Sequence, residues 1–312
     1  MEKKKIYGET LKEQLLASTR DKLTNFIIAD GMIRGVVVNG TRMVNEMRWN
    51  HELGVLETLV LGHAYLAAAL LSATLKGNDR ASISIECSGP IKGFSVETNA
   101  YGEVRGYLKQ VPIPINQPLQ SFNLSPFFGA GFLSVTKYIE DAKHPFTGQV
   151  MMEYGSIAND LALYYLKSEQ LPTSFSLSVL FDANGAVDAA GGLFLQAMPG
   201  AEEEMLKELE QLVKTLPSLA DVVNKDTFPR EWIQHTFNVY TPKILDQRGI
   251  EFMCHCNQKQ IRTMLAMLDL NELKDIARNG PFPMEIRCHN CNTCYTFNQA
   301  DIHTLLTERL AG

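Results

Sequence analysis

The first 253 residues contain a single cysteine, Cys87, and the chain has no excess of positive charge. It carries 29 Lys and Arg against 35 Asp and Glu, a net charge of −6 over 312 residues. This balance disfavours a chain-wide affinity for nucleic acid or for anionic lipid. Because 45% of the residues are hydrophobic and 21% are charged, the composition is that of a globular protein and excludes disorder over most of the chain.

From the sequence we expect neither a membrane span nor a secretory leader. Its most apolar stretch, 55–75, contains Glu57 and His63, which favours a buried helix over a membrane-spanning one. The lysine-rich start is not followed by an apolar run of the kind that leaders carry. We therefore expect a cytoplasmic protein in a reducing environment. Residues 1–20 are polar and helix-prone, and the sequence assigns them no role.

Motifs for catalysis are missing as well. There is no glycine-rich phosphate loop of the Walker type and no Ser/His/Asp set with motif support. Five histidines are scattered along the chain and are expected to be structural or solvated: His51, His63, His144, His235 and His303. The sequence thus predicts a protein that is not an enzyme.

The hydrophobic periodicity predicts an α+β fold with a mostly antiparallel sheet. A long helix is expected over 51–75, a strand within 23–38, and strict alternation predicts a strand over 83–87. Ser156 is a candidate N-cap for a helix over 157–167, and 182–185 is a hairpin turn between two strands. We predict three parts: an α+β core domain over 1–198, a helical linker over 199–250, and a small zinc-binding module over 251–312.

The linker differs in kind from the core. Fifteen of the fifty residues in 201–250 are charged, and apolar residues recur with helical spacing at Met205, Leu206, Leu209, Leu212 and Val213. Two interpretations stand: a linker that simply packs on the sheet, or a metastable segment that can release the surface beneath it. Periodicity alone does not separate them.

Five cysteines fall in the last 62 residues, 251–312. They begin as Cys254-His255-Cys256 and continue, after 31 residues, as Cys288-His289-Asn290-Cys291. Clustered cysteines in a cytoplasmic protein indicate metal or redox chemistry, and two such pairs can supply the four tetrahedral ligands of one Zn²⁺. The stretch 260–277 between the pairs is expected to be helical, ending at Gly280-Pro281.

Other residues near these pairs are alternative ligands. His255 and His289 lie inside the pairs and are expected to point away. Cys294 extends the second pair, so it is either a ligand in place of Cys291 or an accessory thiol nearby. Cys87 is expected to be a small buried residue on a strand.

A zinc ion at this site has either a purely structural role, in folding the module, or a regulatory role as well. Zinc-bound sulfurs are thiolates, the reactive form, so an oxidant can convert Cys254 with Cys256, and Cys288 with Cys291, to disulfides and eject zinc. Structural zinc supplies about 10–16 kcal/mol in small peptides. A whole domain is stable by only about 5–15 kcal/mol, so a module without its zinc should largely unfold.

The sequence resembles the redox-regulated heat-shock chaperone family, also called the 33-kDa chaperonin family, over about 21–301. The matching segments in chain order are 70–76, Gly89-Pro90, 104–107, 168–173, 190–192, 196–200, Phe252-x-Cys254-x-Cys256 and Cys288-x-x-Cys291-x-x-x-Tyr295-x-Phe297. Membership implies an ATP-independent holdase that is inactive when reduced and zinc-bound. Oxidation would form the two disulfides, release one Zn²⁺, unfold the module and linker, and let an often dimeric form bind unfolding client proteins.

The sequence departs from the family at 257–260, Asn-Gln-Lys-Gln, and at Cys294. Cys294 could form the second disulfide with Cys291 or with Cys288 in place of the Cys288–Cys291 pair. Two rival functions remain. A structural zinc-ribbon interaction module is one, although six basic against seven acidic residues in 251–312 disfavour nucleic acid as its partner. A thiol oxidoreductase is the other, but the module is too short to hold the βαβ context of a thioredoxin-like motif.

Overall fold

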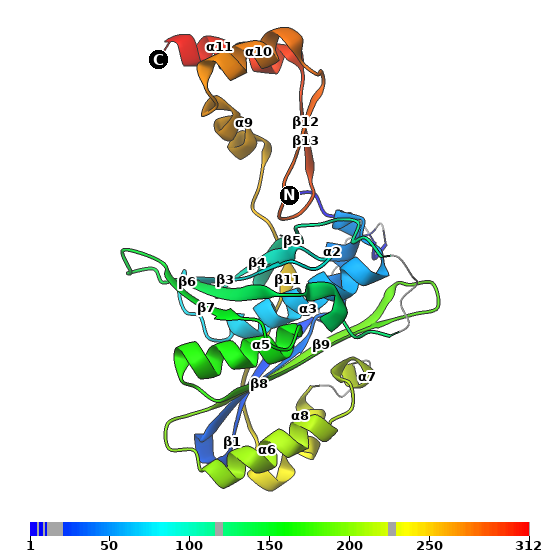
Figure 1. The fold of residues 1–312 in the computed structure, drawn as a ribbon, viewed down its shortest axis with the longest axis vertical. Coiled ribbons are helices and arrows are strands. Elements are labelled where there is room, and N and C mark those ends of the chain that lie inside the picture. Colours follow the sequence, from blue (N-terminus) through cyan, green and yellow to red (C-terminus); the bar gives the residue numbers. More distant parts are fainter. Residues whose placement is uncertain (5, 9, 11–20, 116–120, 224–228, 312) are drawn as a thin grey trace.

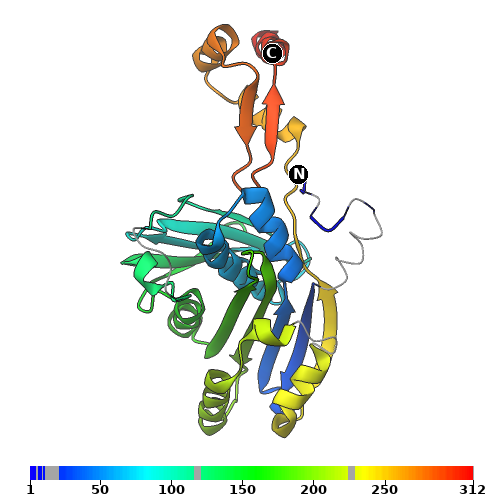
Figure 2. The ribbon, with the colours of Figure 1, turned by 90° about the vertical axis from the view of Figure 1, so that its right-hand side faces the viewer.

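The computed structural model describes residues 1–312 except 5, 9, 11–20, 116–120, 224–228 and 312. Two sheets and a central helix form the core, helices cover one side of it, and a small module stands off one end (Figures 1 and 2). The α+β class predicted from the sequence is confirmed.

The first sheet has five strands, each antiparallel to its neighbours. Their order is β10 (Lys243–Gly249), β1 (Lys22–Ile28), β2 (Ile33–Asn39), β9 (Val187–Ala197) and β8 (Thr173–Phe181). Both faces of this sheet are covered. On β2, Val36 and Val38 pack into the central core, whereas Val37 belongs to a separate cluster on the opposite face. Apolar residues on both faces predict a sheet buried between two layers.

The second sheet has six strands. Their order is β11 (Glu251–Phe252), β5 (Glu103–Leu108), β4 (Gly93–Asn99), β3 (Arg80–Cys87), β6 (Gly131–Tyr138) and β7 (Phe146–Met151). All pairs are antiparallel except β11 with β5, which is parallel. One face is apolar and packs on the central helix, and the other carries polar residues such as Ser82 and Ser84.

Helix α3 (Val55–Ser72) lies between the two sheets and contacts strands of both. It is long and apolar enough to span a membrane by length and composition, but 89% of it is buried inside the protein, as in the core helix of a soluble protein. The remaining core helices are α2 (Thr41–His51), α4 (Ser125–Phe128) and α5 (Ile157–Tyr164), the last continued by a π-helical turn over Tyr165–Glu169.

Helices α6 (Glu203–Thr215), α7 (Leu219–Val223) and α8 (Arg230–Thr236) lie on the outer face of the first sheet. Leu209, Leu219, Ile233 and Phe237 pack there against residues of β1, β2 and β9. The linker is thus helical as predicted. Its last residues form β10, which the sequence analysis did not predict, because most of its side chains are polar and exposed at the sheet edge.

The C-terminal module, residues 251–312, begins with β11 and continues as a small unit of its own. It contains α9 (Gln258–Ala266), α10 (Leu270–Asn279), the hairpin β12 (Met284–Arg287) and β13 (Cys294–Phe297), and α11 (Gln299–Ala311). The stretch expected to be helical between the cysteine pairs forms two helices, α9 and α10, and Gly280 is the C-cap of α10. The module and the linker helices lie at opposite ends of the molecule (Figure 1).

Some predicted boundaries are wrong. The helix expected over 51–75 is interrupted: α2 ends at His51, Glu52 adopts a left-handed conformation (φ 57°), and α3 starts only at Val55. The strand expected within 23–38 is a hairpin of β1 and β2, because Asp30 and Gly31 have positive φ and reverse the chain. Ser156 does cap α5, accepting a hydrogen bond from the Asn159 N–H. At the N-terminus, most of 1–20 lies outside the described residues, and those described form no helix.

Candidate metal centre

The segment that follows β11 and the turn between β12 and β13 bring four cysteines together. Strand β11 pairs with β5, Phe252 opposite Val104, and so fixes the residues that follow it, Cys254 and Cys256. Cys288 and Cys291 occupy the turn between β12 and β13. There the N–H groups of Cys291 and Asn292 donate to the Cys288 carbonyl at 3.3 and 2.7 Å, which closes the turn tightly.

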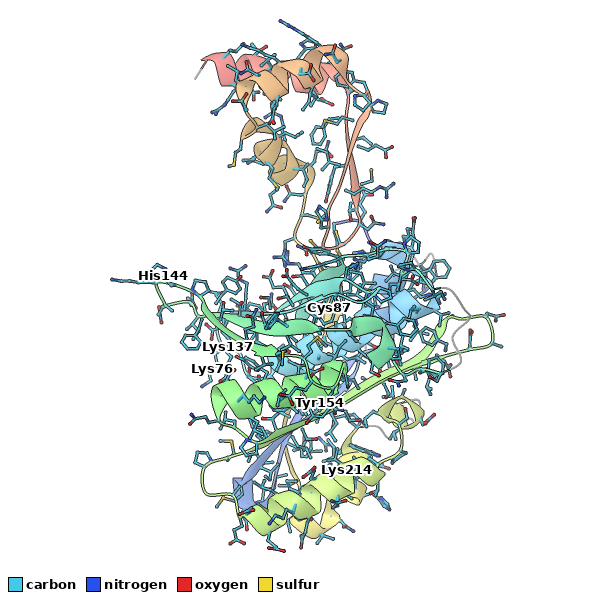
Figure 3. All side chains as sticks on the ribbon, in the orientation of Figure 1. Lys76, Cys87, Lys137, His144, Tyr154 and Lys214 are labelled. Carbon is cyan, nitrogen blue, oxygen red and sulfur yellow. The ribbon has the colours of Figure 1, made fainter. Side chains whose placement is uncertain are left out.

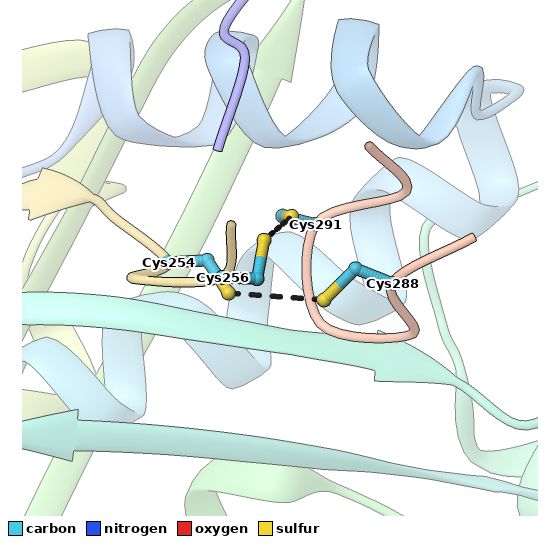
Figure 4. Close-up of side chains that lie close together, drawn as sticks. All are labelled: Cys254, Cys256, Cys288 and Cys291. Carbon is cyan, nitrogen blue, oxygen red and sulfur yellow. Dashed lines mark hydrogen bonds between the residues drawn. The ribbon is translucent and has the colours of Figure 1, made fainter. Parts of the chain in front are cut away.

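The four sulfurs all lie within 4.8 Å of one another (Figure 4). Sγ of Cys254 is 3.8 Å from Sγ of Cys288, and Sγ of Cys256 is 3.3 Å from Sγ of Cys291. A disulfide bond would need about 2.05 Å. Four thiolates about 2.3 Å from one tetrahedral zinc ion lie roughly 3.8 Å apart, so this donor set fits such an ion.

Neighbouring groups add hydrogen bonds to the sulfurs. The Tyr295 hydroxyl donates to Sγ of Cys256 at 3.1 Å, and Nη1 of Arg105 lies 3.9 Å from Sγ of Cys254. The Cys291 thiol contacts Oγ1 of Thr293 at 3.3 Å. Outer partners of this kind orient metal ligands and tune their basicity. Sequence reasoning gave none of these three residues a role at the site.

The thiols share their protons because they lie so close together. Hydrogen bonds from Cys288 and Cys291 hold the pKa of Cys254 well below its usual value. The same contact with Cys254 raises the pKa of Cys288 to about 11 and raises that of Cys291 further. Four thiolates at such short distances therefore require a cation among them.

The centre lies at the junction of module and core. Cys256 and Cys288 contact both the central core cluster and the module's own apolar cluster. The Gly106 N–H donates to the Asn290 carbonyl at 3.2 Å, and Nδ2 of Asn50 donates to the Cys291 carbonyl at 3.1 Å. A change in the bonding of the sulfurs would therefore alter contacts both in the module and in the core.

The alternative ligands named from the sequence lie elsewhere. His255 pairs with Glu103 at 2.7 Å, and the His289 ring packs 5.4 Å from that of Tyr107. Cys294 is half-buried on β13, outside the four-sulfur group. Cys87 is half-buried at the end of β3, away from the module (Figure 3).

Fold and site together define a class: a two-sheet α+β core with a helical cover and a C-terminal module closed by four cysteines. The family model described as "Hsp33 protein" matches residues 21–298. The chain is 35% identical to the 33 kDa chaperonin of Desulforamulus reducens, over 92% of this chain and 97% of that relative. It is 31% identical to that of Ruminiclostridium cellulolyticum, over 93% and 99%.

A solved structure agrees with these relatives. The crystal structure of the 33 kDa chaperonin (heat shock protein 33 homolog) from Thermotoga maritima superimposes with a TM-score of 0.85 at 30% identity. It covers 94% of this chain and 100% of that one. The chain belongs to the Hsp33 family of chaperones.

Proposed function

We propose that this chain is an ATP-independent holdase that oxidation switches on. In the resting state Cys254, Cys256, Cys288 and Cys291 hold one Zn²⁺ and keep the module (251–312) and the linker (199–250) on the core (1–198). The observation that carries the proposal is the gathering of four thiols within 4.8 Å at the junction between module and core.

The chemistry needs an oxidant such as peroxide. Bound zinc would keep all four sulfurs as thiolates, the form that oxidants attack. Two disulfides form when four thiolates give up four electrons to two peroxide molecules, which take up four protons and become four waters. We expect the pairs Cys254 with Cys256 and Cys288 with Cys291. Once the sulfurs are paired, the metal has lost its ligands and leaves.

Loss of the metal would weaken the module more than its own core can offset. Structural zinc contributes about 10–16 kcal/mol in small peptides, which is comparable to the roughly 5–15 kcal/mol that stabilises a whole domain. Disulfides across one or two residues constrain little of the unfolded chain and restore little of this. The module would then separate from β5 and α2.

The surface offered to clients would be the outer face of the first sheet. Phe26, Ile28, Ile33, Val37 and Leu195 form an apolar patch there under the linker helices. Such a patch, once uncovered, is a general binding surface for unfolding proteins.

Helix α6 of the linker packs loosely on the core. In α6 only Leu209 is fully buried. A groove of about 770 Å³ runs between α6 and the core beside α5 and β8, with Tyr154 and Lys214 among its lining residues (Figure 3). A helix of this length is marginal once it leaves its packing partners, so the linker would unfold when released.

The partners we propose are unfolding client proteins in the cytoplasm and a second copy of the chain in the activated state. We propose no nucleic-acid or membrane partner and no substrate turnover. The acidic net charge of −6 supports the first point.

The test uses reduced, zinc-loaded protein treated with peroxide at elevated temperature. Zinc release is followed with a chromogenic chelator, and aggregation of a thermally unfolding client is assayed in the same samples. We expect both signals to rise together and to reverse with reductant, and peptide mapping to find the two expected disulfides. Zinc release without client protection would favour a structural zinc-ribbon module instead.

A matched control addresses Cys294. The Cys294→Ser variant should retain one zinc per chain and the full response, because Cys294 lies outside the four-sulfur group. A lost response in this variant would make Cys294 a working thiol of the switch and would revise the pairing.

A further inference from the structure

Residues 1–4 run beside the cysteine centre at the base of the module (Figures 1 and 2). The family model matches residues 21–298 and so does not include this segment. Its contacts reach both cysteine pairs and the core helix α2.

The segment touches the two cysteine pairs separately. At the first pair, the Cys254 N–H lies 3.1 Å from Sδ of Met1, and the Met1 nitrogen donates to the carbonyls of Cys254 and Cys256 at 3.3 and 2.8 Å. At the second pair, the Glu2 N–H donates to Oγ1 of Thr293 at 3.2 Å. Residues 1 and 2 therefore bridge the two halves of the centre.

Asn50, near the end of α2, joins this segment to the second cysteine turn. Its Nδ2 donates to the Glu2 carbonyl at 2.9 Å and to the Cys291 carbonyl at 3.1 Å, and its Oδ1 accepts from the Lys4 N–H at 3.0 Å. The side chain is buried, with 4% of the residue exposed. Hydrogen bonds at such a buried position are costly to leave unmade.

The Lys3 ammonium adds a charged link between α2 and β11. Its Nζ lies 2.9 Å from Oε2 of Glu46 and 3.1 Å from Oε2 of Glu251. The Glu46 side chain is only 5% exposed, so this pair is shielded from solvent. Lys4 pairs instead with Glu52 at 2.8 Å, and both side chains are largely exposed. An exposed pair of that kind contributes little.

We propose that residues 1–4 act as a strap that pins the C-terminal module to α2 and slows the loss of metal from the four-cysteine centre. The inference rests on the zinc site proposed above and adds its regulation. For the metal to leave, the two cysteine pairs must separate, and the strap is bonded to both of them and to the core. It thereby sets how readily the module is released.

The first test compares the full chain with a chain that starts, after an initiator Met, at Asp21. Both are reduced, loaded with one zinc per chain, and mixed with excess chelator without oxidant. We expect the shortened chain to release zinc about tenfold faster, because several hydrogen bonds that each contribute a few-fold are lost. Equal rates within twofold would overturn the strap.

A pair of point variants keeps the strap testable if the shortened chain does not fold. Lys3→Ala should speed zinc release about threefold to tenfold, because it removes the shielded link to Glu46. Lys4→Ala, next to it in the same strap, should leave the rate unchanged, because its partner is exposed. Equal effects of the two variants would contradict the proposal.

Thr293→Val completes a double-mutant cycle. Oγ1 of Thr293 contacts both Glu2 and Cys291, so the variant alone reports two interactions. If the strap acts through Thr293, the effect of Thr293→Val on the release rate shrinks in the chain that starts at Asp21. An undiminished effect overturns this contact as part of the strap.

These measurements separate the strap from the function on which it rests. If no chain binds one zinc, the metal site fails. If zinc binds one to one and leaves both chains at the same rate, the strap alone fails.

Discussion

In the core, helix α3 is buried along almost its whole length, whereas in the C-terminal module helix α9 and its end keep Met264 and Met267 65% and 75% exposed. The core cluster draws on two sheets and four helices, whereas the module's cluster contains eight buried residues among those described. Small units that bury little apolar surface usually need a metal or disulfides to fold. From this difference we expect the core to be stable through packing and the module to depend on its cysteines and on its contacts with the core.

The largest expected effect comes from removing two of the four proposed zinc ligands. In the variant Cys288→Ser with Cys291→Ser, zinc binding should be lost and the module should unfold, while the core remains folded. Hydrogen exchange should show fast exchange over 251–312 and unchanged protection in α3. The matched control, Cys87→Ser, should retain both zinc and protection. A double variant that kept its zinc and its oxidative response would refute the ligand assignment.

A substitution in the core should lower the stability of the core and leave zinc binding unchanged. Leu66 is fully buried in α3, and Leu66→Ala should lower the free energy of unfolding by about 2–5 kcal/mol. Zinc stoichiometry of the folded protein should not change. Met264→Ala in the module serves as the counterpart, and its effect on unfolding should stay within about 0.5 kcal/mol because the side chain is 65% exposed. Urea denaturation measures both.

Tyr295 tests whether the module's own residues tune the centre. Tyr295→Phe removes the hydroxyl that donates to Sγ of Cys256 and should weaken zinc binding about 10–100-fold. Competition with a chelator of known affinity measures this. Tyr101→Phe, at an exposed tyrosine of the core, is the control and should have no effect. Unchanged affinity in Tyr295→Phe would remove this hydrogen bond from the description of the site.

The smallest expected effect is a pH dependence that belongs to the core. Burial lowers the pKa of His63 in α3 from 6.5 to about 4. The unfolded chain therefore takes up a proton first as the pH falls, so this contribution to stability is complete above pH 6.5 and is lost toward pH 4. Between pH 7 and pH 5 the loss is about 2 kcal/mol.

The matched variant for this prediction is His63→Leu, which has no proton to take up. Denaturation at the two pH values should show a smaller acid loss in this variant than in the parent chain. An identical loss in both would mean that groups outside α3, such as the cysteine centre, dominate the acid response.

The cysteine pairs were predictable because two closely spaced cysteine pairs are typical of a zinc site, and the structure brings these four together. The outer partners were not, because Arg105 is about 150 residues from Cys254 in the sequence and only the pairing of β11 with β5 makes them neighbours. The strap was equally hidden, since its bonds are largely made by backbone atoms and by the side chain of Asn50.

Strict alternation and long apolar runs in the sequence predicted strands and helices of the fold, whereas edge strands left no such pattern. The strand over 83–87, the hairpin turn at 182–185 and the buried helix within 51–75 followed from the sequence pattern. Strand β10 did not, because an edge strand with mostly exposed polar side chains carries no alternation. The break at Glu52 was missed because a single residue in the left-handed region leaves no periodic signal.

Strand β11 pairs with β5 through only two residue pairs, whereas β10, just before it, pairs with β1 through six. The chain between the linker helices and the cysteines is thus held to the core by one long strand pairing and one short one. If the module separated from the core, the short pairing of β11 with β5 would be lost first, and β5 would become the edge strand of its sheet. Its unpaired N–H and C=O groups would then be free to accept an extended segment of another polypeptide as a new strand.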